Sequence, residues 1–478
     1  MPLFSFFIIG IYIFFLTVKK VNGLFINSLA FCALINIHIG IGYFINIGSF
    51  DLYYYDVVLF LTCFISILEL TRIHFPVRYF KRCLFYVSAV IVSLLMLIIN
   101  PVTDAVTTGN EGSYTAYLLG TQKLVSASFV GGSWKSLVWI IMFSITVFVA
   151  FSSFSRKDWY SLLYKLSVMC KIVLVFCMVE LVLKYIFSDF SDGYYSIIKT
   201  VFGTSEKTIY SLIYRYSGVA LQGLTREPSH YVYALMITIL VLWVDKKVNK
   251  SKNIVWIGVS IICMYVSTSF SMVIGLGIPV AFYILYSIRK DKRKSIRFIK
   301  ILFCIIIVLT SVAVFFISEK NYITHDNVLI HRLFSSRGIF LDILTGTSNL
   351  SLTTDDSSIT IRLYSVINTV KLLRYRPLFG MGLATTTCHG SAALLIAELG
   401  IIGTITCILF QFFTLNLFNF KFNKFYIMAV VIWFVSQFFL SHGDMIMKGV
   451  ENIIISVSLM LIFEKIDVNK EQVELATI

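Results

Sequence analysis

Charged residues are scarce in this chain. They make up 14% of its 478 residues, whereas 58% are hydrophobic and 16% are aromatic, and the mean hydropathy is +0.86. This composition leaves too few polar residues to cover one soluble core, so a soluble globular fold is excluded. The chain is predicted to be a polytopic membrane protein.

Cysteine patterns typical of metal sites are also missing. The chain has nine cysteines, and all but one lie in or beside apolar stretches without metal-ligand spacing. We interpret them as apolar packing residues. Cys388 alone falls in a long connection, where it has no obvious disulfide partner. The first apolar stretch ends in Lys19 and Lys20 without a small-residue cleavage site, which favours a retained span over a removed signal peptide.

Apolar runs long enough to cross a membrane recur along nearly the whole chain. A helix needs about 20 mainly apolar residues to cross the roughly 30 Å hydrocarbon layer. Spans are predicted near residues 3–18, 24–45, 52–71, 83–100, 136–154, 166–187, 230–245, 253–269, 271–288, 298–318, 391–414, 425–441 and 450–464. The predicted fold is all-α, a single polytopic membrane domain over residues 1–478 with about 12–13 transmembrane helices.

Basic residues predict the orientation of these spans, because short loops rich in Lys and Arg stay in the cytoplasm. The basic connections are residues 19–20, 72–82, 156–157, 246–252, 289–297, 421–424 and the tail after Glu464. They alternate without a violation, which predicts an outer N-terminus and a cytoplasmic C-terminus. The opposite face then carries residues 101–135 and two periplasmic loops, 189–229 and 319–390. Most of the +15 formal charge is this orientation signal, so no nucleic-acid partner is inferred.

The large loop 319–390 is predicted to carry an amphipathic helix. Its apolar face is formed by Ile359, Leu363, Val366, Ile367, Val370 and Leu373. Its polar face contains Arg362, Ser365 and Thr369. We interpret the segment as a helix that rests on the membrane or the bundle, turns Arg362 outward and stops before Pro377. Snorkelling of its arginines to lipid phosphates is the alternative interpretation.

The stretch RPLFGMG at residues 376–382 follows this helix. Its Gly380 and Gly382 are expected to loosen the backbone ahead of His389 and the next span. Glu398 lies about two turns into that span, where a carboxylate is costly unless it faces the protein interior. A lone histidine at a span boundary is also typical of an interfacial residue.

A second polar group stands at the start of a predicted span, in the stretch LTREPSHYVYAL at residues 224–235. It contains Arg226, Glu227 and His230. Pro228 with the serine beside it would start a helix without any catalytic role. Capping requires neither the arginine nor the histidine, so we favour a functional interpretation.

In their order these motifs resemble the bacterial O-antigen polymerase and ligase superfamily, membrane enzymes that join lipid-linked oligosaccharides. The shared features are a dozen or so spans, a large outer loop, an arginine that precedes an amphipathic helix, PLFGMG, and a histidine nine residues before ELGIIG. REPSHYVYAL resembles the Glu-Pro-Ser motif of O-antigen and capsule polymerases. Two features depart from the pattern. Gly390 stands where ligase-like members have asparagine, and STSFSMVIGLG at 267–277 lacks the arginine of a Ser-Arg pair.

The resemblance implies a glycosyltransferase in the bacterial inner (cytoplasmic) membrane, with its active site on the periplasmic face. Donor and acceptor would be glycans linked to undecaprenyl diphosphate, and the diphosphate would leave. His389 is expected to act as the base, and Arg362 and Arg226 to stabilise the departing diphosphate, with inversion at the anomeric centre. The expected substrate-binding residues are Glu227, His230, Arg374, Arg376 and Glu398. Further expected partners are membrane lipid, a chain-length regulator and a flippase.

No cofactor and no metal are expected. Asp355 and Asp356 lack the separated ligand spacing of a metal-diphosphate site, and arginines are charged at any working pH. Three other functional classes stay open. A ligase would use the same chemistry with lipid A-core as acceptor, a lipid-linked oligosaccharide flippase would carry titratable residues through its spans, and a non-enzymatic membrane protein would not need the outer arginines. Whether the product is O-antigen or capsule is left open by the sequence.

Overall fold

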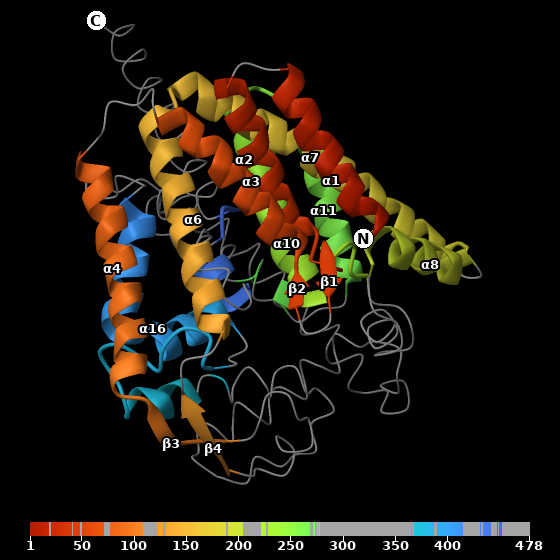
Figure 1. Ribbon diagram of the computed structural model, residues 1–478. Helices are drawn as coiled ribbons and strands as arrows, with labels where there is room; N and C mark the ends of the chain where they lie inside the picture. The colour runs from red at the N-terminus through yellow and green to blue at the C-terminus, as the bar shows by residue number, and fades with distance from the viewer. Residues whose placement is uncertain are drawn as a thin grey trace, which may run out of the picture.

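Helices dominate the computed structural model (Figure 1). The structure describes residues 1–18, 21–40, 42–47, 50–70, 77–108, 122–127, 131–187, 190–203, 221–225, 228–267, 271–272, 275, 277, 365, 368–386, 390–413, 431, 434–440, 447 and 449–451. The helices are α1 (Leu3–Val18), α2 (Val21–His38), α3 (Tyr54–Leu70), α4 (Val77–Ile99), α6 (Gly131–Ser153), α7 (Arg156–Tyr185), α8 (Ser191–Phe202), α10 (Pro228–Val248), α11 (Ile254–Val266), α16 (Ser391–Phe413) and the π-helical turn η2 (Ser436–Leu440).

Four of these helices are long and apolar enough to cross a membrane. The crossing stretches are Phe80–Ile99, Gly132–Ser153, Arg156–Leu183 and Ser391–Gln411. The chain is therefore a mostly helical protein with helices suited to a bilayer, in agreement with the predicted class. The full number of spans stays a prediction, because predicted span 298–318 and most of 271–288, 425–441 and 450–464 lie outside the described residues.

Two short β-hairpins interrupt the helices, which the sequence did not predict. β1 (Ile45–Ile47) pairs antiparallel with β2 (Phe50–Leu52), and β3 (Val102–Thr108) pairs antiparallel with β4 (Gln122–Ala127). The first hairpin shortens the predicted span 24–45, since α2 ends at His38. Gly42 has a φ of 81°, which favours glycine and turns the chain out of the helix.

Hydrogen bonds hold parts of the three segments predicted to be outer against the bundle or against each other. The Gly40 N–H, just after α2, donates to the Leu224 carbonyl, 3.1 Å away. The Ser133 hydroxyl, in the first turn of α6, donates to the Leu383 carbonyl at 2.7 Å. The β3–β4 hairpin lies near the bottom of Figure 1, close below the cyan segment before α16, and the β1–β2 hairpin lies near mid-height. The membrane face on which these segments lie stays a prediction.

Helix α7 begins well before the predicted span 166–187. Ser155 and Asp158 form a capping box, because the Ser155 N–H donates to the Asp158 carboxylate (2.9 Å) and the Asp158 N–H donates to the Ser155 hydroxyl (3.4 Å). The basic pair Arg156 and Lys157 therefore lies in the first turn of a helix rather than in a loop.

The predicted outward polar face of the helix before Pro377 is wrong for the residues that the structure describes. Residues 365 and 368–373 are helical. Ser365 and Thr369 are buried, whereas Val370 is 54% exposed. The Thr369 hydroxyl lies 3.2 Å from the Ala393 carbonyl of α16 and 2.8 Å from the Ser365 carbonyl. Small hydroxyl groups fit a close helix–helix contact and find acceptors there, so they turn toward the protein.

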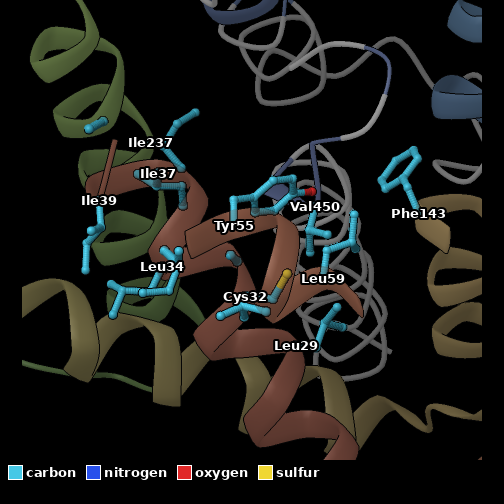
Figure 2. Close-up of a cluster of buried hydrophobic side chains, with 14 of the residues drawn as sticks. Leu29, Cys32, Leu34, Ile37, Ile39, Tyr55, Leu59, Phe143, Ile237 and Val450 are labelled. Carbon is cyan, nitrogen blue, oxygen red and sulfur yellow. The ribbon is translucent and has the colours of Figure 1, made fainter. Parts of the chain in front are cut away.

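The end of the connection between the last two predicted spans, with the first residue of the last span, reaches into the core. Val450 is fully buried, and Figure 2 shows it with Tyr55 and Leu59 of α3 in one hydrophobic cluster. The Tyr86 hydroxyl of α4 donates to the Met447 carbonyl at 2.9 Å. These residues therefore pack among the helices instead of lying in a surface loop.

The cysteine interpretation is confirmed for the part of the chain that the structure describes. Its free, buried cysteines are Cys32, Cys63, Cys83, Cys170, Cys177, Cys263 and Cys407. All of these except Cys63 belong to the hydrophobic core of the bundle, and Cys63 is 4% exposed. Cys304 and Cys388 lie outside the described residues.

Candidate functional site

Half of the predicted site residues can be located. Arg226, Glu227, Arg362 and His389 lie outside the described residues, so their predicted roles stay predictions. His230, Arg374, Arg376 and Glu398 are described. Arg376 and Glu398 belong to one assembled region, which we call the Arg376 region and define as residues 376–383 with 397–402. His230 belongs to a second, which we call the Glu180 region and define as Glu180, Tyr195 and residues 221–231.

The Arg376 region is built around a break in α16. Gly400 has a φ of 65° and a ψ of −167°, which no α-helix contains. The PLFGMG stretch pairs with the chain on both sides of this break. Four backbone hydrogen bonds join them, from Ile401 N–H to Pro377 O (2.9 Å), Ile402 N–H to Leu378 O (3.0 Å), Met381 N–H to Ala397 O (2.8 Å) and Gly382 N–H to Glu398 O (2.9 Å). The two sequence motifs, PLFGMG and ELGIIG, are thus one structural unit.

Glycines permit this close pairing. A Cβ on Gly400 would lie 2.6 Å from the Leu378 carbonyl carbon, and one on Gly380 would lie 2.5 Å from the Gly400 nitrogen. Both residues also have positive φ values, 65° and 69°. The expectation that Gly380 and Gly382 loosen the backbone is therefore wrong. Gly380 lets two backbones pack against each other, and a Cβ on Gly382 would lie 2.7 Å from the Leu97 side chain.

Arg376 places a buried cation at the C-terminal end of α4. Its Nη1 donates to the Met96 carbonyl at 3.1 Å, where the last carbonyls of a helix carry partial negative charge. The side chain is only 8% exposed, and Nη2 has no hydrogen-bond partner within the described part of the chain. Burial lowers the pKa of Arg376 below its usual value of 12.5, yet a guanidinium stays charged at neutral pH. One donor of this cation is thus available for a further acceptor.

Glu398 lies in the protein interior, as the cost of a lipid-facing carboxylate requires. Glu398 is only 3% exposed. The Ser93 hydroxyl of α4 reaches both the Glu398 carbonyl (3.0 Å) and the Phe379 carbonyl (2.7 Å). Ser93 therefore ties α4 to both segments of the Arg376 region.

In the Glu180 region, a fully buried carboxylate holds the chain just before the REPSH stretch. Glu180 lies near the C-terminal end of α7 and is 0% exposed. It accepts hydrogen bonds from the Tyr195 hydroxyl of α8 (3.1 Å), the Gln222 N–H (3.4 Å) and the Gly223 N–H (2.8 Å). Burial, together with the charge of Glu180, raises the pKa of Tyr195, so this phenol stays protonated and donates.

The turn held by Glu180 requires glycine and leads directly into α10. Gly223 has a φ of 58°, and a Cβ there would lie 2.8 Å from the Tyr231 ring. The Thr225 hydroxyl donates to the Gln222 carbonyl at 2.7 Å and closes the turn. The backbone that enters Arg226 and Glu227 is therefore fixed by α7, α8 and α10 together.

The two remaining described residues differ in their surroundings. His230 is half-buried in the first turn of α10. Arg374 is exposed in the turn before Pro377, where its N–H donates to the Lys371 carbonyl at 3.1 Å. Both α10 and α16 pack against η2, so the Glu180 and Arg376 regions belong to helices with one common neighbour.

Among the buried acids that sequence reasoning missed, Glu180 and Glu451 accept hydrogen bonds from several segments. Glu451 is 0% exposed and accepts hydrogen bonds from the Asn36 amide and from the Tyr233 hydroxyl of α10, the latter at 3.1 Å. A signal for both was present in the sequence, since each is a carboxylate within a predicted apolar span, which is costly in lipid. The partners could not be found that way because they come from distant segments.

No protein-family model and no curated protein matches the chain. Its chemistry is therefore argued from its own residues. Arg376 offers a buried planar cation with one nitrogen unpartnered among the described residues. Guanidinium groups suit phosphate oxygens, because their fork geometry matches two acceptors and their charge persists at all working pH values.

Proposed function

We propose that the chain is a polymerase that joins oligosaccharide repeat units linked to undecaprenyl diphosphate into O-antigen or capsular polysaccharide. The observation that carries this proposal is the pairing of PLFGMG with the break in α16, which buries Arg376 with one nitrogen unpartnered within the described residues. The substrate class in this proposal comes from the order of the motifs along the chain, which resembles that of O-antigen polymerases. The active site would face the periplasm, in the inner membrane of a bacterium.

The proposed reaction mainly requires stabilisation of the negative charge that grows on the leaving diphosphate. A hydroxyl of the acceptor sugar attacks the anomeric carbon of the donor, its proton passes to a base, and the bond from that carbon to the diphosphate breaks. Arg376, with Arg226 and Arg362, would stabilise the negative charge that grows on the diphosphate. His389 would take the proton, since its ordinary pKa of about 6.5 suits a general base.

The test compares Arg376→Gln with Arg156→Gln, an exposed arginine at the opposite end of the bundle. We expect Arg376→Gln to shorten or abolish the glycan ladder, by about a hundredfold in polymerisation rate. Single repeat units should persist, because they are assembled and exported upstream. Arg156→Gln should leave the ladder unchanged. A normal ladder from well-expressed Arg376→Gln protein would refute the proposed role.

A flippase is the second candidate, because broken helices such as α16 also occur in transporters, at their substrate sites. The intermediate that accumulates when the protein is lost distinguishes a polymerase, a ligase and a flippase. Loss of a polymerase leaves single lipid-linked units at the outer face, loss of a ligase leaves finished polymer on undecaprenyl diphosphate, and loss of a flippase leaves units on the cytoplasmic side. Purified protein that forms polymer from lipid-linked units in excess chelator would support the metal-free polymerase.

The proposal also requires that the large loop 319–390 faces outward. A cysteine introduced at Ser348 should react with an impermeant thiol reagent added to intact cells whose outer membrane is permeabilised. One introduced at Ser251, just after α10, should be spared. The reverse pattern would contradict the predicted orientation.

A further inference from the structure

A groove lies between α4 and α16, toward the N-terminal end of α4 and the C-terminal end of α16. Its volume is about 300 Å³, and its lining residues are Lys81, Arg82, Phe85, Thr406, Leu409 and Phe410. The first three belong to the N-terminal part of α4, and the others belong to the C-terminal part of α16. These helix ends meet because α4 and α16 pack against each other in opposite directions.

The floor of the groove is firmly packed. The Phe410 ring stacks on the Tyr86 ring, with centroids 5.2 Å apart and planes 13° apart, and Phe143 of α6 meets Phe410 edge-on at 6.1 Å. Tyr86 is fully buried. Such packed aromatic rings keep the groove from collapsing.

The side chains that line the groove are charged at one end and mainly apolar along the rest of its length. Lys81 is exposed near the start of α4, and one helical turn further on Phe85 is 61% exposed. Arg82 adds a second cation, and the six lining residues include no acid. Beyond Phe85, the exposed side chains of α4 are apolar except for Ser88, as suits a surface in contact with lipid tails. One end of the groove is therefore cationic, and its walls are apolar.

We propose that this groove binds one anionic phospholipid, with the phosphate at Lys81 and Arg82 and an acyl chain along Phe85, Leu409 and Phe410. Charge complementarity selects an anion, and basic pockets between membrane helices suit anionic headgroups. The apolar walls select a lipid over a free phosphate, since a small anion leaves them exposed to water. The volume of about 300 Å³ is at the lower end of the range for ligand pockets, enough for part of a lipid.

The competing explanation is that Lys81 and Arg82 only orient the helix, as basic residues beside a span generally do. The adjacent pair Arg156 and Lys157 provides a matched control. It is exposed in the first turn of α7, just after α6, and Phe80 of α4 packs on Phe148 of α6 with centroids 6.0 Å apart. Both pairs therefore lie at the same end of the bundle, but Arg156 and Lys157 do not line the groove.

The experiment measures binding of phosphatidylglycerol to the purified full-length protein in detergent, by native mass spectrometry and by thermal stabilisation. Phosphatidylcholine and inorganic phosphate serve as the other two probes. We expect phosphatidylglycerol alone to bind and stabilise. Lys81→Gln with Arg82→Gln should weaken its affinity about thirtyfold, because each cation near a membrane contributes about fivefold. Arg156→Gln with Lys157→Gln should bind like the unmodified protein.

A second variant tests the groove itself without a change in charge. Leu409→Trp fills the wall between the helices, so it should weaken binding of phosphatidylglycerol although both cations remain. Equal binding of phosphatidylcholine, equal loss in the control pair, or undiminished binding in Leu409→Trp would each overturn the proposal. Stabilisation by inorganic phosphate to the same extent would show an anion site without a lipid.

Discussion

The Arg376 region and the Glu180 region lie at the same end of the bundle, but they are held in different ways. In the Arg376 region the contacts are mainly between backbones, because four main-chain hydrogen bonds join PLFGMG to the broken helix α16. In the Glu180 region one carboxylate gathers three donors from two other segments. The first therefore depends on the absence of side chains at Gly380 and Gly400, and the second depends on one side chain.

This difference predicts how each region fails. A backbone junction tolerates changes of side chain but not the addition of a Cβ, because the two main chains have no space between them. A region held by one carboxylate is destabilised when its oxygens are removed, because each buried donor left without an acceptor has a desolvation cost. The following variants test that contrast. Their unfolding can be followed with a thiol-reactive dye, since the described cysteines are buried until the protein unfolds.

Gly400→Ala should have the largest effect. A positive φ costs an L-residue about 1–2 kcal/mol, and the added Cβ meets the Leu378 backbone, so we expect a loss of about 4 kcal/mol in the free energy of unfolding. Gly258→Ala is the control, because a Cβ at that helical position in α11 meets nothing within 4 Å. It should be neutral or slightly stabilising. A melting temperature for Gly400→Ala equal to that of the control would contradict the backbone junction.

Glu180→Ala should destabilise the protein by about 3 kcal/mol, because three donors lose their acceptor. Glu180→Gln should lose about half as much, since its amide oxygen still accepts. Hydrogen exchange distinguishes the two regions. The Gln222 and Gly223 amides should exchange faster in Glu180→Gln and remain protected in a matched variant of the other region, Ser93→Ala. Unchanged exchange at both amides would refute the role of Glu180.

Tyr195→Phe should cost about 1.5 kcal/mol, because it removes one hydrogen bond to a carboxylate and leaves the ring in place. Tyr194→Phe is the neighbouring control on α8. We expect the Gly223 amide to stay protected in Tyr195→Phe, since Glu180 still accepts from it. Loss of protection as large as in Glu180→Gln would show that the tyrosine, not the carboxylate, fixes the turn.

Ser93→Ala should have the smallest effect, about 1 kcal/mol. Its hydroxyl reaches the Phe379 and Glu398 carbonyls, but the four backbone bonds of the Arg376 region do not involve it. The melting temperature should therefore fall only slightly, and Arg376 should stay buried. A loss comparable to that of Gly400→Ala would mean that α4, not the backbone pairing, holds the region together.

The sequence predicted several features of these regions well. Apolar runs predicted α1, α4, α6 and α16, and most of the predicted helix ends lie within a few residues of the observed ones. Only helices and closed barrels can satisfy the backbone in lipid, so a long apolar run indicates a helix. The depth of Glu398 indicated a carboxylate turned toward the protein. The C-terminal end of α2 was missed, since a glycine turn interrupts an apolar stretch there. The start of α7 was missed because the polar stretch SRKD was assigned to a loop, although Ser155 and Asp158 form a capping box in it.

The two regions could not be assembled from the sequence. Glycines at 380 and 382 were expected to loosen the chain. A glycine alone does not reveal that another backbone lies against Gly380 and the Leu97 side chain against Gly382. Glu180 gave no indication that its partners are Tyr195 and the turn at Gln222 and Gly223. The polar face with Ser365 and Thr369 was assigned to the outside, although it packs on α16, since in a membrane small polar residues often form the helix contact.

The sequence by itself determined that this is a membrane protein of long apolar helices, because the bilayer imposes length and hydrophobicity on each span separately. It also determined which polar groups interrupt those spans. Only the tertiary structure decided which of them meet, that α16 breaks at Gly400 to receive PLFGMG, and that Arg376 lies buried at the end of α4. Arg376 and Met96 are 280 positions apart, and the pairing of PLFGMG with α16 joins two backbones around glycines. These contacts follow from the packing of segments against one another and not from any local pattern.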